Sequence, residues 1–110
     1  MIHKEKEIIQ WAIDRNILGP TGEGTKYGQV SKTLEEVIEL NSSIFFRNKD
    51  GVCDAIGDIV VTLMIQAEMW GMTIEECIEA AWQQIKDRKG RMVEGIFVKD
   101  IQYGSDDFTK

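Results

Sequence analysis

Hydrophobic residues recur at three- and four-residue steps along most of this chain, which is the spacing of amphipathic helices. Ile8, Ile9, Ala12 and Ile13 form the apolar stripe of a first predicted helix. A glycine-rich segment at residues 19–28, which holds the only proline, follows and predicts a loop. The pattern therefore separates a first helix from the rest of the chain.

The same spacing predicts a second helix over about residues 29–46 and a third over about residues 52–70, joined by a turn at residues 48–51. The middle of the third helix, around Val61 and Ile65, is apolar on nearly all sides. A helix of that kind packs against several neighbours, so we expect it to be buried on most of its circumference.

Thr73 and Glu76 have the spacing of a capping box, which predicts the start of a fourth helix with a buried apolar stripe, ending near Gly90. Residues 91–110 contain one short apolar patch, at residues 95–98, and we expect a short extended C-terminal arm there. Four helices with short connections predict an all-α four-helix bundle, formed by a single domain over residues 1–110.

Charge and cysteine usage narrow the possible partners. The chain has 110 residues and a net charge of −6, which disfavours a nucleic-acid polymer as partner because its phosphates attract basic surfaces. No apolar run is long enough to cross a membrane, and the N-terminus lacks the features of a signal peptide. Cys53 and Cys77 lie in apolar patterns and are expected to be buried free thiols. Together these features predict a cytoplasmic location.

Carboxylates on two of the predicted helices are unusually placed. Glu36 and Glu39 share one face of the second helix. Asp58 lies in the most apolar part of the third helix, one turn after Asp54, and a buried carboxylate without a partner is energetically costly. Gly57, beside Asp58, leaves room for another backbone or a ligand to approach.

If these two helices are antiparallel neighbours, four carboxylates converge, and oxygen ligands of this kind suit Mg²⁺ or Mn²⁺. Other interpretations stay open: a solvated acidic face on the second helix, and, for Asp58, a helix cap or an ion pair with a lysine such as Lys32 or Lys86. A di-iron bundle is excluded because it uses paired Glu-x-x-His motifs, and the only histidine is His3.

The segment Glu35-Glu36-x-x-Glu39, followed by a short turn and an apolar helix with Gly57-Asp58, resembles the MazG-like all-α nucleoside triphosphate pyrophosphohydrolases. The likeness covers residues 29–98 and is closest to the short MazG-like proteins of phages and Gram-positive bacteria. Lys32 and the basic segment at residues 86–91 fit the same pattern.

The chain departs from the family pattern at one position of the third helix. The family usually has Glu-x-x-Asp there, which would place a glutamate at position 55. This chain has Ala55 and offers Asp54 instead. Because Asp54 and Asp58 are four residues apart, they still share a helix face, although the shorter aspartate alters one metal position.

The resemblance implies hydrolysis of a nucleoside triphosphate between its α- and β-phosphates, giving the monophosphate and pyrophosphate. In such a site Mg²⁺, or Mn²⁺, neutralises phosphate charge while a carboxylate orients or deprotonates water. A homodimer or homotetramer is also implied, because the family site usually lies between subunits. The residues expected to take part are Glu35 or Glu39 as the base; Glu36, Glu39, Asp54 and Asp58 as metal ligands; Lys32, Lys86, Arg88 and Arg91 on the outer phosphates; and Trp11 or Tyr27 on the base of the nucleotide.

Structural interpretations compete with several of these assignments. The basic segment is also favourable as charge at a helix C-terminus, and each aromatic residue can serve plain packing. Two other functions remain open: a non-catalytic helical module that binds a nucleotide or a protein, in which Ala55 marks a lost ligand, and a related enzyme such as a phosphoribosyl-ATP pyrophosphatase. Residues 19–26 nearly match a P-loop, but the last pair, Thr25-Lys26, is inverted and a helix precedes it, so a P-loop is excluded.

Overall fold

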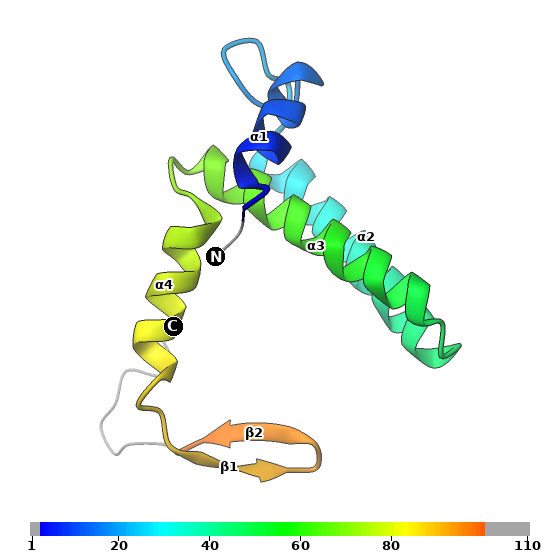
Figure 1. Cartoon of the computed structure of the whole chain (residues 1–110), viewed down its shortest axis with the longest axis vertical. Coiled ribbons are helices and arrows are strands. Elements are labelled where there is room, and N and C mark those ends of the chain that lie inside the picture. Colours follow the sequence, from blue (N-terminus) through cyan, green and yellow to red (C-terminus); the bar gives the residue numbers. More distant parts are fainter. Residues whose placement is uncertain (1–2, 101–110) are drawn as a thin grey trace. The chain divides into compact units, whose positions relative to one another are not determined.

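The computed structural model describes residues 3–100, and it is mostly helical (Figure 1). The elements in chain order are α1 (Glu5–Asp14), α2 (Lys26–Phe45), α3 (Lys49–Met69), α4 (Ile74–Ile85), β1 (Gly90–Val93) and β2 (Ile96–Lys99). The chain divides into two compact units, residues 1–77 and 78–110, and α4 begins in the first and ends in the second. The helical class is confirmed, whereas closure of a four-helix bundle and the single domain stay predictions.

α2 and α3 lie antiparallel along each other as a helical hairpin (Figure 1). The Thr33 hydroxyl of α2 donates a hydrogen bond to the Thr62 hydroxyl of α3 at 2.8 Å, and Thr62 donates in turn to the Ile59 carbonyl at 2.7 Å. Thr62 is buried, so its hydroxyl needs these partners. The contact sets the register of the two helices within about one turn of Glu36 and Asp58.

Both helices of the hairpin begin three residues earlier than predicted, because a side chain caps each start. The Thr25 hydroxyl accepts from the Gly28 N–H at 2.9 Å, and the Asn48 side-chain oxygen accepts from the Gly51 N–H at 3.0 Å. The predicted turn at residues 48–51 is therefore wrong. The chain reverses just before it, where Arg47 adopts a left-handed conformation with φ of 53°.

The core of the first unit lies mainly along α3, with one fully buried residue from α1, which also contacts α3. Its apolar members are Ala12, Ala55, Met64, Ile65 and Ala67. The expectation that α3 is buried on most sides is correct around Ile65 but wrong for Ile56 and Leu63, whose side chains are exposed. The three alanines of this core allow close helix contact, but they enclose little volume.

The capping box at the start of α4 is confirmed. The Thr73 hydroxyl accepts from the Glu76 N–H, and a Glu76 carboxylate oxygen accepts from the Thr73 N–H, both at 3.1 Å. Glu5 of α1 adds a third contact, since its carboxylate accepts from the Ile74 N–H at 2.8 Å. Only the first turn of the predicted buried stripe of α4 is partly covered, because Ile78, Trp82 and Ile85 are exposed.

The C-terminal end of the described chain differs from the prediction in detail. α4 ends at Ile85, and Gly90 opens strand β1 instead of ending the helix. The extended arm is an antiparallel hairpin in which Gly90 pairs with Lys99 and Val93 with Ile96. The remainder of the predicted arm, residues 101–110, lies outside the described residues.

Two further expectations concern thiols and membranes. Cys53 and Cys77 are both free, but Cys53 is exposed and Cys77 is only half-buried, so the expectation of buried thiols is wrong for Cys53 and met only in part for Cys77. Within residues 3–100, no helix has both the length and the apolar character needed to span a bilayer.

Candidate functional site

An open groove of about 480 Å³ follows the α2–α3 hairpin and collects the predicted acidic residues; we name it the acidic groove. Its lining residues are Lys32, Glu35, Glu36, Glu39, Ser43, Asn48, Gly51, Asp54, Ala55 and Asp58. The structure thus brings together all five carboxylates assigned to catalysis or metal binding, with Lys32 beside them. Five acids and one lysine leave this groove strongly negative.

Glu36 and Asp58 meet across the groove, one from each helix. Asp58 lies close enough to raise the pKa of Glu36 both by its charge and as a side-chain partner, so that a proton on Glu36 is favoured. The pKa of Glu36 is raised by burial and then by the negative charge of Asp58, with a smaller contribution from Glu39; only Lys32 lowers it. The Glu36 side chain is 14% exposed. A proton on Glu36 or a nearby cation would therefore relieve the repulsion between the two acids.

Lys32 supplies the positive charge closest to the pair, but only partly compensates it. Its ammonium lies 3.7 Å from a Glu35 oxygen and 3.8 Å from a Glu36 oxygen. The open alternative in which Lys32 pairs with Asp58 is therefore not the arrangement in this structure. Because the Lys32 side chain is half exposed, its interaction with the acids is screened by solvent.

The expected burial of Asp58 is wrong: Asp58 and Asp54 are both exposed. The orientation of α3 explains this exposure. The face of α3 that is turned toward α2 passes through Ala55, Ile59 and Thr62, and Asp58 lies beside that face. Glu36 is the more covered acid of the pair, because it is half-buried with a side chain that is 14% exposed. A Cβ atom added at Gly57 would meet nothing within 4 Å, so no close contact in this structure requires a glycine there, and the approach of a ligand stays a prediction.

Ala55, at the position where the MazG-like pattern has a glutamate, is only 2% exposed and lines the groove. A small side chain there lets α2 and α3 pack closely. The carboxylate available at this level is that of Asp54, which is exposed and lines the same groove.

The groove fits a hard divalent cation in its chemistry. All its acidic donors are carboxylate oxygens, and two of them already lie in contact. Among residues 3–100, however, no three His, Cys, Asp or Glu side chains stand close enough together to hold an ion. Glu39 and Asp54 would need to turn inward, which like-charge repulsion opposes until positive charge enters.

A second groove of about 430 Å³ lies between α1 and α3; we name it the Trp11 groove. Its lining residues are Glu7, Ile8, Trp11, Asp58 and Val61. Asp58 lines both grooves, so the two adjoin. Trp11 is 45% exposed, and the Arg15 guanidinium lies 5.6 Å from the centre of its ring.

Tyr27, the other aromatic residue expected to contact the nucleobase, is differently placed. Tyr27 lies in the first turn of α2, is 86% exposed, and lines neither the acidic groove nor the Trp11 groove. Of the two candidates, the structure thus places only Trp11 next to the acids.

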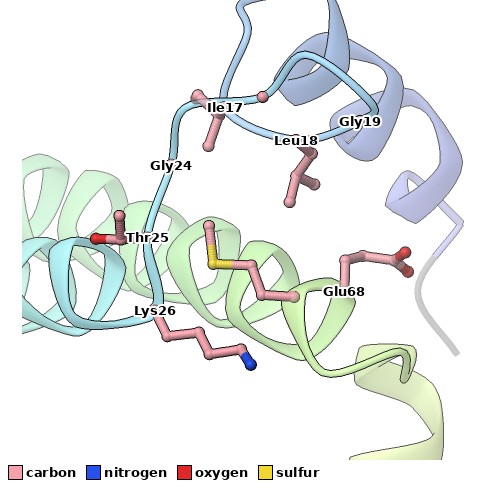
Figure 2. Close-up of a pocket in the computed structure, with 9 residues that line it drawn as sticks. Ile17, Leu18, Gly19, Gly24, Thr25, Lys26 and Glu68 are labelled. Carbon is pink, nitrogen blue, oxygen red and sulfur yellow. The ribbon is translucent and has the colours of Figure 1, made fainter.

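The glycine-rich loop forms a separate hollow of about 440 Å³, with Lys26 and Glu68 at its α2 and α3 sides (Figure 2). Three of its backbone N–H groups are already engaged, because those of Gly22, Glu23 and Gly24 donate to the carbonyls of Gly19, Asn16 and Ile17. A P-loop needs such groups free to bind phosphate, so the exclusion of a P-loop is supported. Glu68 adds unfavourable charge, although burial and the nearby carboxylates of Glu5 and Glu76 raise its pKa.

The remaining predicted phosphate ligands belong to the second compact unit. Lys86 and Arg88 follow the end of α4, and Arg91 lies in β1. Positive charge just past a helix C-terminus is favourable in itself, so the helix-dipole interpretation of Lys86 and Arg88 stays open. Their action at the groove stays a prediction.

Sequence reasoning missed three polar side chains that line the grooves. Ser43 follows Glu36 at seven residues and Asn48 is the cap of α3, so each could have been placed from helical spacing or capping. Glu7 lies four residues before Trp11 on the same face of α1.

No protein-family model, curated protein or solved structure matches this chain. The MazG-like interpretation therefore rests on the sequence motif and on the groove in which its acids meet.

Proposed function

We propose that the protein is a Mg²⁺-dependent nucleoside triphosphate pyrophosphohydrolase, with Mn²⁺ as a possible substitute, that cleaves ribo- or deoxynucleoside triphosphates between the α- and β-phosphates. The supporting observation is the contact between Glu36 and Asp58 in a groove lined by three further carboxylates and one lysine. Carboxylates held together without enough positive charge suit a divalent cation and the phosphates it bridges.

The metal would be held by Glu36 and Glu39 of α2 and by Asp54 and Asp58 of α3. When bound, Mg²⁺ supplies positive charge against the phosphate oxygens and increases the acidity of nearby water. Hydrolysis adds a water oxygen to a phosphorus of the α–β bridge, breaks the bridging P–O bond and releases pyrophosphate. A carboxylate must take the proton of that water.

Glu35 or Glu39 would act as this base. Both line the groove, but they differ in surroundings. The charge of Glu39 acts on Glu36, which suits a further metal ligand, whereas Glu35 is held by Lys32 at 3.7 Å. Glu35 is therefore the stronger candidate for the base.

Lys32 would leave its contacts with Glu35 and Glu36 and bind the outer phosphates instead. Lys86, Arg88 and Arg91 would bind the same phosphates. The nucleobase would lie against Trp11, since its groove adjoins the metal ligands at Asp58. Tyr27 stays a weaker candidate for contact with the nucleobase.

We also propose that two copies of the chain associate through α2, as a homodimer or within a homotetramer. One flank of α2 carries an apolar stripe whose side chains are between 44% and 77% exposed: Val30, Leu34, Val37, Ile38, Ile44 and Phe45. This stripe offers roughly 600 Å² of apolar surface, so two copies would bury roughly 1,200 Å², the lower end of stable interfaces. It contains no charge, and Asn41 in its midst can donate to and accept from its counterpart near a two-fold axis.

Ile38→Lys should abolish this association, because a charge would be buried at the centre of the stripe. The mass in solution, measured by light scattering over a range of protein concentrations, should fall to that of one chain. Gln10→Lys on α1 adds the same charge away from the stripe and should leave the mass unchanged. A wild-type protein that is monomeric at all concentrations would exclude the α2 interface.

A non-catalytic nucleotide-binding module is the second candidate, favoured by the burial of Ala55 where the family pattern has a ligand. Purified protein should therefore be incubated with Mg²⁺ and a panel of ribo- and deoxynucleoside triphosphates, with products separated by chromatography. We expect monophosphate and pyrophosphate, and a loss of roughly 100-fold or more in Asp58→Ala. Absence of turnover with every triphosphate, in Mg²⁺ and in Mn²⁺, would favour the binding module.

A further inference from the structure

The Trp11 groove combines an aromatic face with hydrogen-bond acceptors. Ile8, Trp11 and Val61 supply apolar surface, and Glu7 and Asp58 supply carboxylates. None of these five side chains offers a strong donor except the indole N–H of Trp11. A flat ring can stack on Trp11, and its polar edge is then favoured if it carries donors.

The position of this groove relates it to one part of the substrate. The proposed cleavage lies between the α- and β-phosphates, and the α-phosphate carries the nucleoside. A pocket for the base must therefore adjoin the metal ligands, and the Trp11 groove does so at Asp58. This step rests on the proposed function.

We propose that the Trp11 groove binds the nucleobase and that Glu7 selects cytosine and adenine, which carry an exocyclic amino group, over uracil, thymine and hypoxanthine, which carry an oxo group at that ring position. An amino group donates to the Glu7 carboxylate. The oxo group at the same ring position of uracil or hypoxanthine presents lone pairs to that carboxylate and is repelled.

The local geometry suits this role. Glu7 and Trp11 are four residues apart on α1, so they share one face of the helix. Lys4 contacts Glu7 at 3.2 Å and leaves the second carboxylate oxygen for the base. The Glu7 side chain is 66% exposed, so water competes with the base and the expected selectivity is about tenfold, far below that of an enclosed site.

The test uses binding of nucleoside monophosphates, which needs no turnover. Dissociation constants for two matched pairs, CMP against UMP and AMP against IMP, would be measured by calorimetric titration of the full chain. We expect the amino-bearing member of each pair to bind about tenfold more tightly. Trp11→Ala should weaken binding of all four by about tenfold through loss of stacking.

Glu7→Gln should reduce both selectivity ratios to below about threefold, because its amide can also donate to an oxo group. Asp14→Asn removes a carboxylate of α1 outside the groove and should leave both ratios unchanged. Equal binding within each pair, no binding of any of the four, or ratios unaffected by Glu7→Gln would overturn the proposal. Pyrophosphate release from triphosphates with equal binding within each pair would reject base selection alone and leave the proposed hydrolysis standing.

Discussion

Replacing Glu36 with glutamine is expected to make the metal-free protein more stable and, at the same time, far less active. In the wild type, Glu36 is held against Asp58 with its charged form disfavoured by burial and by like charge. An amide of nearly the same shape removes the repulsion and can donate to Asp58. It also removes a proposed metal ligand, so pyrophosphate release should fall roughly 100- to 1,000-fold.

The dependence of stability on pH gives the same variant a second readout. The pKa of Glu36 is higher in the folded than in the unfolded chain, so the folded state binds more protons between the two values. The Glu36 contribution to stability is therefore greatest below the unfolded-state pKa and is lost as pH rises through the folded-state pKa. Urea unfolding of metal-free wild type should show this loss, and Glu36→Gln should flatten it.

Magnesium should make the wild type more stable than Glu36→Gln, which reverses the order expected without metal. At ten times its dissociation constant, an ion that binds only the folded state adds about 1.4 kcal/mol to the wild type. Glu36→Gln should gain less, and the exposed loop variant Glu23→Gln should behave as wild type in every assay. If Glu36→Gln loses stability without metal and keeps full activity, the two carboxylates are a structural pair and not a metal site.

The helices and the acidic face were predictable because they depend on local spacing. Glu35, Glu36 and Glu39 lie where helical periodicity places them, and the capping box at Thr73 fixes a helix start by local hydrogen bonds alone. That Asp58 would meet Glu36 also followed, since antiparallel helices joined by a short turn must be neighbours.

Burial was harder to predict, because it depends on which face of each helix finds a partner. Apolar composition suggested that Asp58 is buried, yet Asp58 is exposed and the half-buried Glu36 is the more covered acid. Ile56 and Ile78 show the same limit: both are apolar and both are exposed. Hydrophobic periodicity identifies a face that can be buried, but not the element that covers it.

Ala55→Glu, which introduces the glutamate of the MazG-like pattern, is expected to destabilise the metal-free protein by about 3 kcal/mol. Ala55 is 2% exposed, so a longer side chain has to push α2 and α3 apart or bury its charge. The new carboxylate would also lie near the Glu36–Asp58 pair and add to its repulsion. Urea unfolding in the absence of divalent ions measures the loss.

Ala55→Gln separates the two causes, because it has nearly the size of glutamate without the charge. Both variants should lose stability through overpacking, but only the glutamate should recover on addition of Mg²⁺, since only it adds a ligand. Asp54→Glu, at the exposed neighbouring position, should cost less than about 0.5 kcal/mol. If Ala55→Glu unfolds at the same urea concentration as the wild type, position 55 has room for the family glutamate. Close packing of α2 on α3 would then not explain why this chain places its carboxylate at Asp54.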